Sequence, residues 1–297
     1  MRDYHSIEEA IREIFGNTVV VQNTSRISGG DINETSCLFL SNGAKLFLKT
    51  NRSKDKAFFI SEMEGLAAIK RTGTISVPET CCAGYDLKAG AFLLMEYVEN
   101  ARKVPDFWAR FAVDLCKMHS ADAFSFVSGG RFGFLKDNFI GSREQDNTPT
   151  DGWVDFFRDR RLVPRFKAAK SYFDEAMKRK VDNLLGHLDK WLIEPKEPSL
   201  LHGDLWGGNF IVGSDGRAWL IDPAVYVGHA EADLAMTELF GGFSDIFYRE
   251  YLRLSGFEPG YEDRREIYNL YHLLNHLISF GASYLGAVRR IVDHFAG

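Results

Sequence analysis

The first hundred residues contain short apolar runs separated by turn-forming residues, as expected for β-strands. Residues 18–50 read as β-hairpins, and Asn42-Gly43 is typical of a tight turn between two strands. Two further strand-like runs lie within 77–100, and the second is continuously apolar before it ends in polar residues. This part of the chain therefore predicts a β-sheet.

Helical periodicity appears at two places within this strand-rich part. Near the amino terminus, apolar residues recur at a spacing that predicts an amphipathic helix with one apolar face, made of Ile7, Ile11, Ile14 and Phe15. Residues 55–71 show the same spacing and end before Thr72-Gly73, with an apolar face made of Phe58, Met63 or Leu66, and Ile69. Each segment predicts a helix that packs against the sheet.

After about residue 100 the pattern becomes mainly helical. A loop-rich insertion at 120–152 and a short β segment at 201–224 interrupt it. Strands first and helices afterwards predict an α+β fold with two lobes and a cleft between them. The predicted boundaries are 1–97 for a small β-rich lobe and 98–297 for a larger, mainly helical lobe.

Composition narrows the classes of function. The 297 residues include 41 acidic and 36 basic side chains, a net charge of −5, so a general basic surface for nucleic acid or anionic membrane is excluded. No apolar run approaches the roughly 18 residues of a membrane span, and the first residues do not resemble a signal peptide. The four cysteines lack CxxC spacing, which favours reduced thiols and a cytoplasmic location.

The segment 201–209, LHGDLWGGN, carries the clearest chemical signal. It places Asp204 and Asn209 five residues apart, and Asp222 ends an apolar strand 18 residues after Asp204. Phosphoryl transfer needs a carboxylate near the accepting hydroxyl and oxygen ligands that hold Mg²⁺ against the phosphates. The three residues have the spacing of a kinase catalytic loop followed by its metal-binding acid. The alternative is that they are turn-forming residues of a surface hairpin.

Upstream residues complete this set. Lys49 ends a strand, where its ammonium could reach the phosphates, and Glu62 on the following helix could hold it by an ion pair. Glu64 competes for that role, but the helical spacing favours Glu62.

Backbone groups at two places could contact a nucleotide. Gly29 and Gly30 lie in a turn between two strands, where a glycine-rich backbone could cover phosphates; a plain hairpin turn is the alternative. The residues that end the last strand could hydrogen-bond an adenine edge, namely Met95, Glu96, Tyr97 and Val98.

Together these motifs resemble the fructosamine/ketosamine kinase family, a branch of the aminoglycoside-phosphotransferase and choline-kinase-like group with a protein-kinase-like fold. The resemblance covers nearly the whole chain, and Trp206 in HGDLWGGN distinguishes it from a generic phosphotransferase loop. The most specific match is DPAVYVGHAEADLAMTELFGGF at 222–243. Further matches are FGFLKDNFIG at 132–141, WVDFFRDRRLVP at 153–164 and YNLYHLLNHLISFG at 268–281.

The resemblance implies ATP- and Mg²⁺-dependent phosphorylation of ketosamines at the third-carbon hydroxyl, which leads to deglycation. By motif, Asp204 would accept the proton, Asn209 and Asp222 would bind Mg²⁺, and Lys49 with Glu62 would orient the phosphates. Met95 to Val98 would form the nucleotide hinge. Many members carry cysteine after the paired glycines, where this chain has Asp31, so redox control through a thiol at that turn is not expected.

Other residues have less certain roles. Trp206, Asn138 and Trp153 could contact the acceptor, although packing or turn roles are equally open for them. His202 is expected to brace the catalytic loop through a backbone hydrogen bond. The triplet His229, Glu231 and Asp233 could suggest a metal site, but the resemblance favours bracing roles. The basic stretch 155–180 has the composition of a solvated helix face.

Two other functions remain as alternatives. A kinase for another small acceptor, such as an aminoglycoside, choline or a sugar, would use the same nucleotide machinery. A nucleotide-binding pseudokinase scaffold is disfavoured by the presence of Lys49, Asp204, Asn209 and Asp222 together. The preferred ketosamine, whether it is free or protein-bound, and the oligomeric state do not follow from the sequence.

Overall fold

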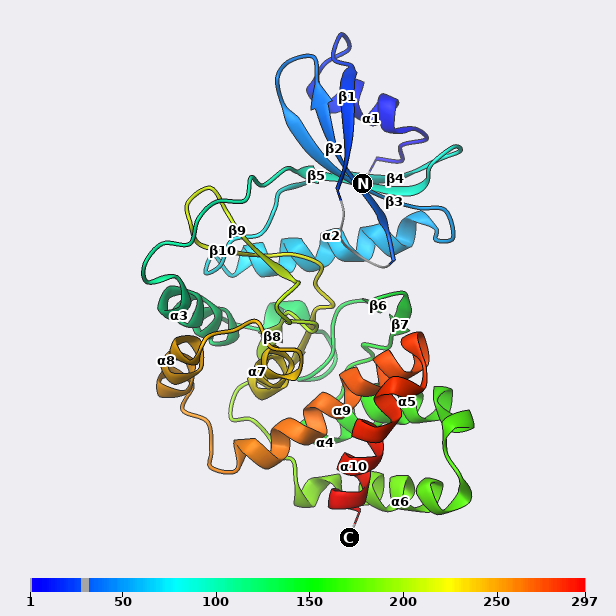
Figure 1. Ribbon diagram of the computed structural model, residues 1–297, viewed down its shortest axis with the longest axis vertical. Helices are drawn as coiled ribbons and strands as arrows, with labels where there is room; N and C mark the ends of the chain where they lie inside the picture. The colour runs from blue at the N-terminus through cyan, green and yellow to red at the C-terminus, as the bar shows by residue number, and fades with distance from the viewer. Residues whose placement is uncertain (1, 28–31, 297) are drawn as a thin grey trace.

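The computed structural model describes residues 2–27 and 32–296. Within these ranges, the amino-terminal strands form one antiparallel sheet of five strands in the order β1-β2-β3-β5-β4 (Figure 1). Its elements are α1 (Ile7–Phe15), β1 (Val21–Ile27), β2 (Glu34–Leu40), β3 (Lys45–Asn51), α2 (Lys56–Arg71), β4 (Thr80–Asp86) and β5 (Gly90–Glu96). The predicted strands are confirmed, as is the turn at Asn42, whose side-chain oxygen accepts a hydrogen bond from the Ala44 N–H at 3.1 Å.

The inner strand β5 is buried on both faces, because its side chains alternate between two separate cores. The edge strand β1 is mostly exposed. In β5, Leu93 and Met95 belong to the main core, which α2 shares with the carboxyl-terminal part of the chain. Phe92 and Leu94 point the other way, into a second core cluster beneath α1. The continuous apolar run in this strand therefore reflects burial on both faces.

Helix α1 forms where predicted, but its packed face differs in one position. Ala10 and Ile11 are buried, and Ile7 and Phe15 pack against the second cluster. Ile14 is 38% exposed, so its predicted place on the packed face is wrong. The reason is that this small cluster does not cover all of the last helical turn.

The carboxyl-terminal part is mainly helical, as predicted, and Figure 1 shows its helices gathered below α2. Its longer elements are α3 (Phe107–His119), α4 (Trp153–Phe156), a π-helical turn (Phe157–Leu162), α5 (Val163–Ala168), α6 (Glu175–Gly186), α7 (Ala230–Leu239), α8 (Asp245–Ser255), α9 (Tyr261–Phe280) and α10 (Leu285–Phe295). Four 3₁₀ turns are described at Phe124–Phe126, Lys170–Tyr172, Leu188–Lys190 and Ala282–Tyr284.

Short strands form three two-stranded pairs in this part of the described chain. They are β6 (Asn138–Ile140) with β7 (Arg143–Gln145), β8 (Ser199–Leu201) with β11 (Tyr226–Gly228), and β9 (Phe210–Val212) with β10 (Ala218–Leu220). The β6–β7 hairpin lies inside the insertion that the sequence predicted only as loop-rich. Strands of three residues are too short to show a recognisable alternation.

Two expected absences can be compared with the described residues. None of their helices is both long enough and apolar enough to cross a membrane. All four cysteines are described and carry free thiols, as predicted: Cys37, Cys81, Cys82 and Cys116.

Candidate functional site

The loop 202–209 lies directly against the segment that follows Asp222. The Ala224 N–H donates a hydrogen bond to the His202 carbonyl oxygen at 2.8 Å. Gly203 has φ +82°, and a Cβ on it would collide with the carbonyl oxygen of Ala224. Glycine is therefore required here both for the left-handed backbone and for the close approach that brings Asp204 and Asp222 into one site.

A buried carboxylate fixes the beginning of this loop. Asp233, on α7, accepts hydrogen bonds from the backbone N–H groups of His202 and Gly203 at 2.6 and 2.8 Å. Its other contact is with Nε2 of His119, on α3, at 3.1 Å. Burial alone would raise the pKa of Asp233, but the contacts with His119 and the Gly203 N–H outweigh it and lower the pKa. Sequence reasoning expected a brace at Asp233 and missed His119.

His202 braces the loop as predicted. Its Nε2 lies 2.9 Å from the Ile221 carbonyl oxygen, and its Nδ1 accepts the Asp204 N–H at 3.3 Å. An Nδ1 that accepts and an Nε2–H that donates define a neutral imidazole. Burial also lowers the pKa of His202, in agreement with this tautomer.

The remaining members of the His229 triplet also have structural contacts. Nδ1 of His229 accepts the Glu231 N–H at 3.2 Å and so caps α7. Glu231 forms a two-pronged ion pair with Arg264 at 2.6 and 2.7 Å. No group of three or more His, Cys, Asp or Glu side chains suited to a metal occurs among the described residues. The bracing interpretation is confirmed by these contacts.

Asp204 and Asn209 are in direct contact. The side-chain amide of Asn209 donates to the backbone oxygen of Asp204 at 2.7 Å and to its Oδ2 at 3.2 Å. Burial, together with the charge of Asp222, raises the pKa of Asp204 to about 7. A carboxyl group that titrates near neutral pH is well suited to accept a proton from a hydroxyl group.

Lys49 connects the sheet to this loop. Its ammonium lies 2.6 Å from Oε1 of Glu62 and also contacts Oδ1 of Asp222. Burial would lower the pKa of Lys49, but the two carboxylates more than offset it, so the pKa lies above its ordinary value. Glu64 instead pairs with Lys136 at 2.5 Å, which supports the choice of Glu62. We call Lys49, Glu62, Asp204, Asn209 and Asp222 the reactive cluster.

Asp222 has an unusual backbone. Its φ of +56° is the one positive value among the described non-glycine residues. Left-handed backbone costs energy for residues other than glycine and concentrates at functional sites. Here it occurs at the residue whose side chain meets Lys49 and whose charge acts on Asp204.

The structure describes only some of the other residues that the sequence predicts to contact the nucleotide. Gly29 and Gly30 lie outside the described residues. Among the described residues that follow them, Asn33 accepts a hydrogen bond on its Oδ1 from the Asn51 side-chain amide at 2.9 Å. Met95 and Glu96 end β5, and Met95 is buried. Tyr97 and Val98 continue beyond the strand and are half-buried.

Trp153 does not face a cleft. Its side chain is fully buried, and its indole N–H donates to the hydroxyl oxygen of Tyr268 at 3.1 Å. It packs among aromatic rings of α4, the following π-helical turn and α9. The prediction that Trp153 might contact the acceptor is therefore wrong for this structure: the apolar ring and its one donor are both satisfied in the core.

Asn138 also has a framework role. It is 5% exposed and donates to the Val225 carbonyl oxygen at 2.7 Å. Its Oδ1 accepts hydrogen bonds from Gln145 and Asn147 at 2.8 and 3.0 Å. We call these three residues the amide network. Acceptor contact through the Asn138 side chain is not supported, because the network uses its donor and its acceptor.

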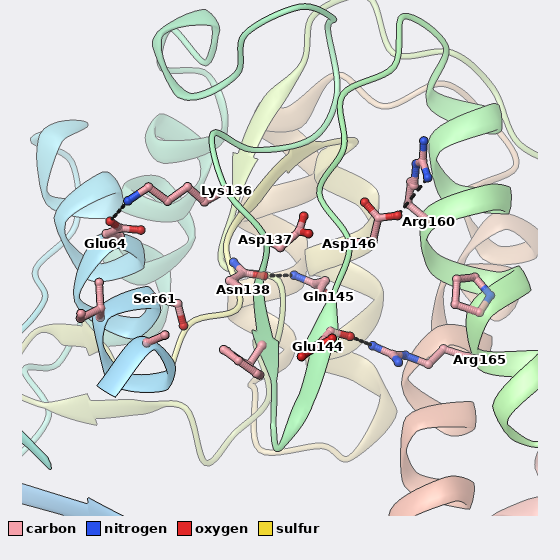
Figure 2. A pocket seen from close by; sticks show the side chains of 14 residues that line it. Ser61, Glu64, Lys136, Asp137, Asn138, Glu144, Gln145, Asp146, Arg160 and Arg165 are labelled. Atoms are coloured by element: carbon pink, nitrogen blue, oxygen red, sulfur yellow. Dashed lines mark hydrogen bonds and ion pairs between the residues drawn. The ribbon is translucent and has the colours of Figure 1, made fainter. Parts of the chain in front are cut away.

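A cavity of about 640 Å³ lies behind this network, between α2 and the insertion. Figure 2 shows Ser61 and Glu64 on one wall and Arg160 and Arg165 on the other. Asn138 and Gln145 are bonded to each other within the lining. No member of the reactive cluster lines this cavity, so it is distinct from the site of Lys49 and Asp204.

Two aromatic residues lie close to Asp204. Trp206, two residues further along, is 40% exposed, so it remains a candidate for acceptor contact. His272, on α9, has its Nδ1 3.7 Å from Oδ1 of Asp204. Burial lowers the pKa of His272 to about 3, so the ring is neutral. Sequence reasoning missed His272, because nothing in its linear spacing ties it to a loop almost seventy residues earlier.

Comparison with known proteins gives a consistent picture. The sequence profile described as Fructosamine kinase matches residues 3–296. A Synechocystis protein assigned as a ketoamine kinase is 38% identical, covering 95% of this chain and 92% of that protein. The chloroplastic protein-ribulosamine 3-kinase of Arabidopsis thaliana is 36% identical, covering 97% and 88%. A crystal structure assigned as a fructosamine-3-kinase of Haemophilus somnus superposes with a TM-score of 0.82 at 26% identity, covering 98% and 96%.

Proposed function

The chain belongs to the fructosamine kinase family, and from this premise we propose that it transfers the γ-phosphoryl group of ATP to the third-carbon hydroxyl of a ketosamine. Its relatives at 36–38% identity carry the names ketoamine kinase and protein-ribulosamine 3-kinase. A phosphate ester at that carbon is labile, so the reaction leads to removal of the sugar from the amine. The observation that carries the proposal is the braced Asp204 carboxyl group beside Asn209 and Asp222.

In the proposed reaction, Asp204 acts on the acceptor hydroxyl. Its carboxylate accepts the hydroxyl proton while the hydroxyl oxygen bonds to the γ-phosphorus. The bond from that phosphorus to the bridging oxygen breaks, ADP leaves, and the proton stays on Asp204 until solvent removes it. The raised pKa of Asp204, about 7, makes it a stronger base than an ordinary aspartate.

The proposed metal ligands fit the chemistry of Mg²⁺. Asp222 offers a carboxylate, and Asn209 directs its amide nitrogen to Asp204, which leaves its side-chain oxygen for a cation. Mg²⁺ prefers such oxygen ligands and typically binds through one or two protein groups plus phosphates. When bound, the ion would neutralise charge on the phosphates.

Lys49 and Glu62 would orient the nucleotide. The ammonium is held at 2.6 Å from Glu62, so the α- and β-phosphates would meet a cation whose position is already fixed. We assign the purine edge to the backbone of Met95, Glu96, Tyr97 and Val98, and the phosphate cover to Gly29 and Gly30. The proposed lobes are 1–97 and 98–297, consistent with the end of β5 at Glu96.

An activity panel tests the proposal. ADP release is measured with ribulosamine, erythrulosamine and fructosamine adducts of lysine, with aminoglycosides, and with choline, and Asp204→Ala serves as the inactive control. We expect turnover on at least one ketosamine and none by the variant. Robust turnover on another acceptor class, with no ketosamine turned over, would overturn the assignment.

A further inference from the structure

The cavity between α2 and the insertion lies between two elements that reach the reactive cluster. On one wall, Ile60, Ser61 and Glu64 belong to α2, the helix that also carries Glu62. Glu62 holds the Lys49 ammonium at 2.6 Å. This wall is therefore part of the same helix as one of the two carboxylates that fix the lysine.

The insertion side of the cavity is connected to the other carboxylate. Asn138 lines the cavity and donates to the Val225 carbonyl oxygen at 2.7 Å. Gln145 also lines it and donates to the Ala224 carbonyl oxygen at 3.0 Å. These two oxygens closely follow Asp222, the second partner of the lysine ammonium. A molecule in the cavity would thus contact two elements whose relative position decides how that ammonium is held.

The cavity has the size and lining of a small-molecule site. Its volume of about 640 Å³ lies within the roughly 300–1,000 Å³ that is typical of ligand pockets. Such pockets combine apolar groups with a few polar ones. The apolar part of this lining consists of Ala57, Ile60, Phe139 and Pro164.

Four charged side chains of the lining neutralise one another in pairs. Glu64 pairs with Lys136 at 2.5 Å, which joins α2 to the insertion (Figure 2). Asp146 pairs with Arg160 at 2.9 Å. Neither pair presents a net charge to the cavity.

Arg165, Glu144 and Asp137 also line the cavity and are not neutralised in this way. The Arg165 guanidinium donates to the Glu144 carbonyl oxygen at 2.7 Å. Among the described residues it has no carboxylate partner, and its Nε is buried without a hydrogen bond. Burial and the charge of Arg165 lower the pKa of Arg143. The carboxylates of Glu144 and Asp137 likewise have no basic partner in the described part of the chain. The lining therefore presents an unpaired cation and unpaired carboxylates together.

We propose that this cavity binds a free α-amino acid with an apolar side chain, and that the bound amino acid strengthens nucleotide binding. Its α-carboxylate would bind to Arg165, because a planar guanidinium matches a carboxylate in shape and charge. Its α-ammonium would bind to the carboxylate of Glu144 or Asp137. Its side chain would pack against Ala57 and Ile60, on α2.

The arrangement of charges favours a zwitterion over an ion of one sign. The Arg165 guanidinium lies 2.7 Å from the backbone of Glu144, so a cation and a carboxylate-bearing residue are adjacent, as the two charged groups of an α-amino acid are. An anion such as phosphate would be repelled by Glu144 and Asp137. An amine without a carboxylate would leave Arg165 unpaired.

The coupling to the nucleotide rests on the proposed function, in which Lys49 orients the phosphates, whereas the binding of the amino acid does not. A ligand that contacts both α2 and the insertion would stabilise the arrangement in which Glu62 and Asp222 hold Lys49. Nucleotide affinity should therefore rise, by about 5-fold. Because coupling between two sites is reciprocal, the nucleotide must raise the affinity for the amino acid by the same factor.

Isothermal titration calorimetry of the whole chain tests the site, with L-leucine as the probe. Two analogues each lack one charged group: 4-methylpentanoate has no ammonium and 3-methylbutylamine has no carboxylate. We expect L-leucine to bind wild type and each analogue to bind at least about 10-fold more weakly. Arg165→Gln should weaken L-leucine binding by a similar factor. The matched control is Lys167→Gln, which removes an exposed cation on the same helix outside the cavity and should change the Kd less than about 2-fold.

A second variant covers the case in which Arg165→Gln does not fold, as judged by circular dichroism. Ala57→Phe places a ring in the cavity without changing a charge and should abolish L-leucine binding. Failure of wild type to bind L-leucine, or equal binding by wild type and Ala57→Phe, would overturn the site. Equal affinity for 4-methylpentanoate and L-leucine would overturn the assignment to an amino acid.

The coupling is measured by repeating the L-leucine titration with saturating Mg²⁺ and a non-hydrolysable ATP analogue. A roughly 5-fold lower Kd for L-leucine supports the coupling. An unchanged Kd, with the analogue bound, would overturn the coupling and leave the proposed function intact. If the analogue does not bind at all, the proposed function fails, while the titrations without nucleotide still decide whether the cavity is an amino-acid site.

Discussion

The reactive cluster and the amide network both consist of polar groups, all buried or half-buried except the exposed Asp222, and they share one chain segment. Asp222 belongs to the reactive cluster, while the carbonyl oxygens of Ala224 and Val225 accept hydrogen bonds from Gln145 and Asn138 of the network. Their composition differs: the cluster contains four charged side chains, and the network contains only neutral amides. One cluster is arranged for chemistry and the other holds it in place.

The two regions differ most in how completely their polar groups are paired by hydrogen bonds. Gln145 donates to Asn138 and to Ala224, and its oxygen accepts the Tyr271 hydroxyl at 2.7 Å. In the reactive cluster, Asp204 carries a pKa near 7 and Asp222 a strained backbone. A network of neutral amides whose donors and acceptors are paired contributes rigidity. Charged groups with shifted pKa values and a strained backbone are typical of a functional site.

The largest expected effect is at Asp204. Asp204→Asn keeps the size of the side chain and removes the proton acceptor, so turnover should fall about 10³-fold. Coupled ADP release measures it, with circular dichroism as the check on folding. A variant with near wild-type turnover would remove Asp204 from the reaction and weaken the distinction between the two regions.

Lys49 should give the next largest effect. Lys49→Met should reduce turnover about 100-fold and lower the free energy of unfolding by about 3 kcal/mol, because Glu62 remains buried without its cation. The matched control is Lys136→Met, which breaks an exposed pair with Glu64 and should cost less than about 1 kcal/mol. Urea titration measures both. Equal losses would show that burial does not distinguish the two pairs.

The pH dependence gives a smaller, graded effect. Below about pH 7 Asp204 becomes protonated, so kcat/KM of the free enzyme should fall tenfold per pH unit. The folded-state pKa exceeds the ordinary 3.8, so the folded state holds a proton that the unfolded chain has lost between about pH 4 and 7. Ionised Asp204 therefore costs stability above pH 7, and this cost vanishes as the pH falls.

Asp204→Asn tests directly whether the ionised carboxylate lowers the stability of the folded state. The variant should be more stable than wild type at pH 8, by roughly 4 kcal/mol, and equal to it near pH 4. Thermal or urea unfolding across this range gives the difference. A variant that is less stable at pH 8 would mean that the carboxylate is stabilised by its surroundings.

Substitutions of the two tryptophans, Trp153 and Trp206, should have smaller effects and test the comparison between framework and site. Trp153→Phe removes a buried hydrogen bond and part of a packed ring, so it should destabilise by about 2 kcal/mol and leave the acceptor KM unchanged. Trp206→Ala removes a 40% exposed ring that packs on Phe240, so it should destabilise by about 1 kcal/mol and raise the acceptor KM about 10-fold. If the two variants exchanged these phenotypes, the assignment of core and site would be reversed.

The sequence predicted the sheet, the main helices and the reactive cluster, because these depend on local periodicity and on a motif of fixed spacing. It could not decide the roles of Asn138 and Trp153. Both residue types are common in binding sites and in frameworks, and only their burial and partners separate the two. His119 and His272 were missed for a related reason: their positions beside Asp233 and Asp204 are created by tertiary packing.

The smallest expected effect concerns the four thiols, two buried and two half-buried, which have no role in the proposed reaction. Burial raises the pKa of all four, with Cys82 raised to about 12, so little reactive thiolate is present at neutral pH. The family resemblance implies that Asp31, outside the described residues, stands where many members carry cysteine. Peroxide treatment should therefore change turnover by less than about 1.5-fold, whereas Asp31→Cys should become sensitive in a way that a thiol reductant reverses. Strong, thiol-reversible inhibition of wild type, traced to any of its four cysteines, would contradict the prediction.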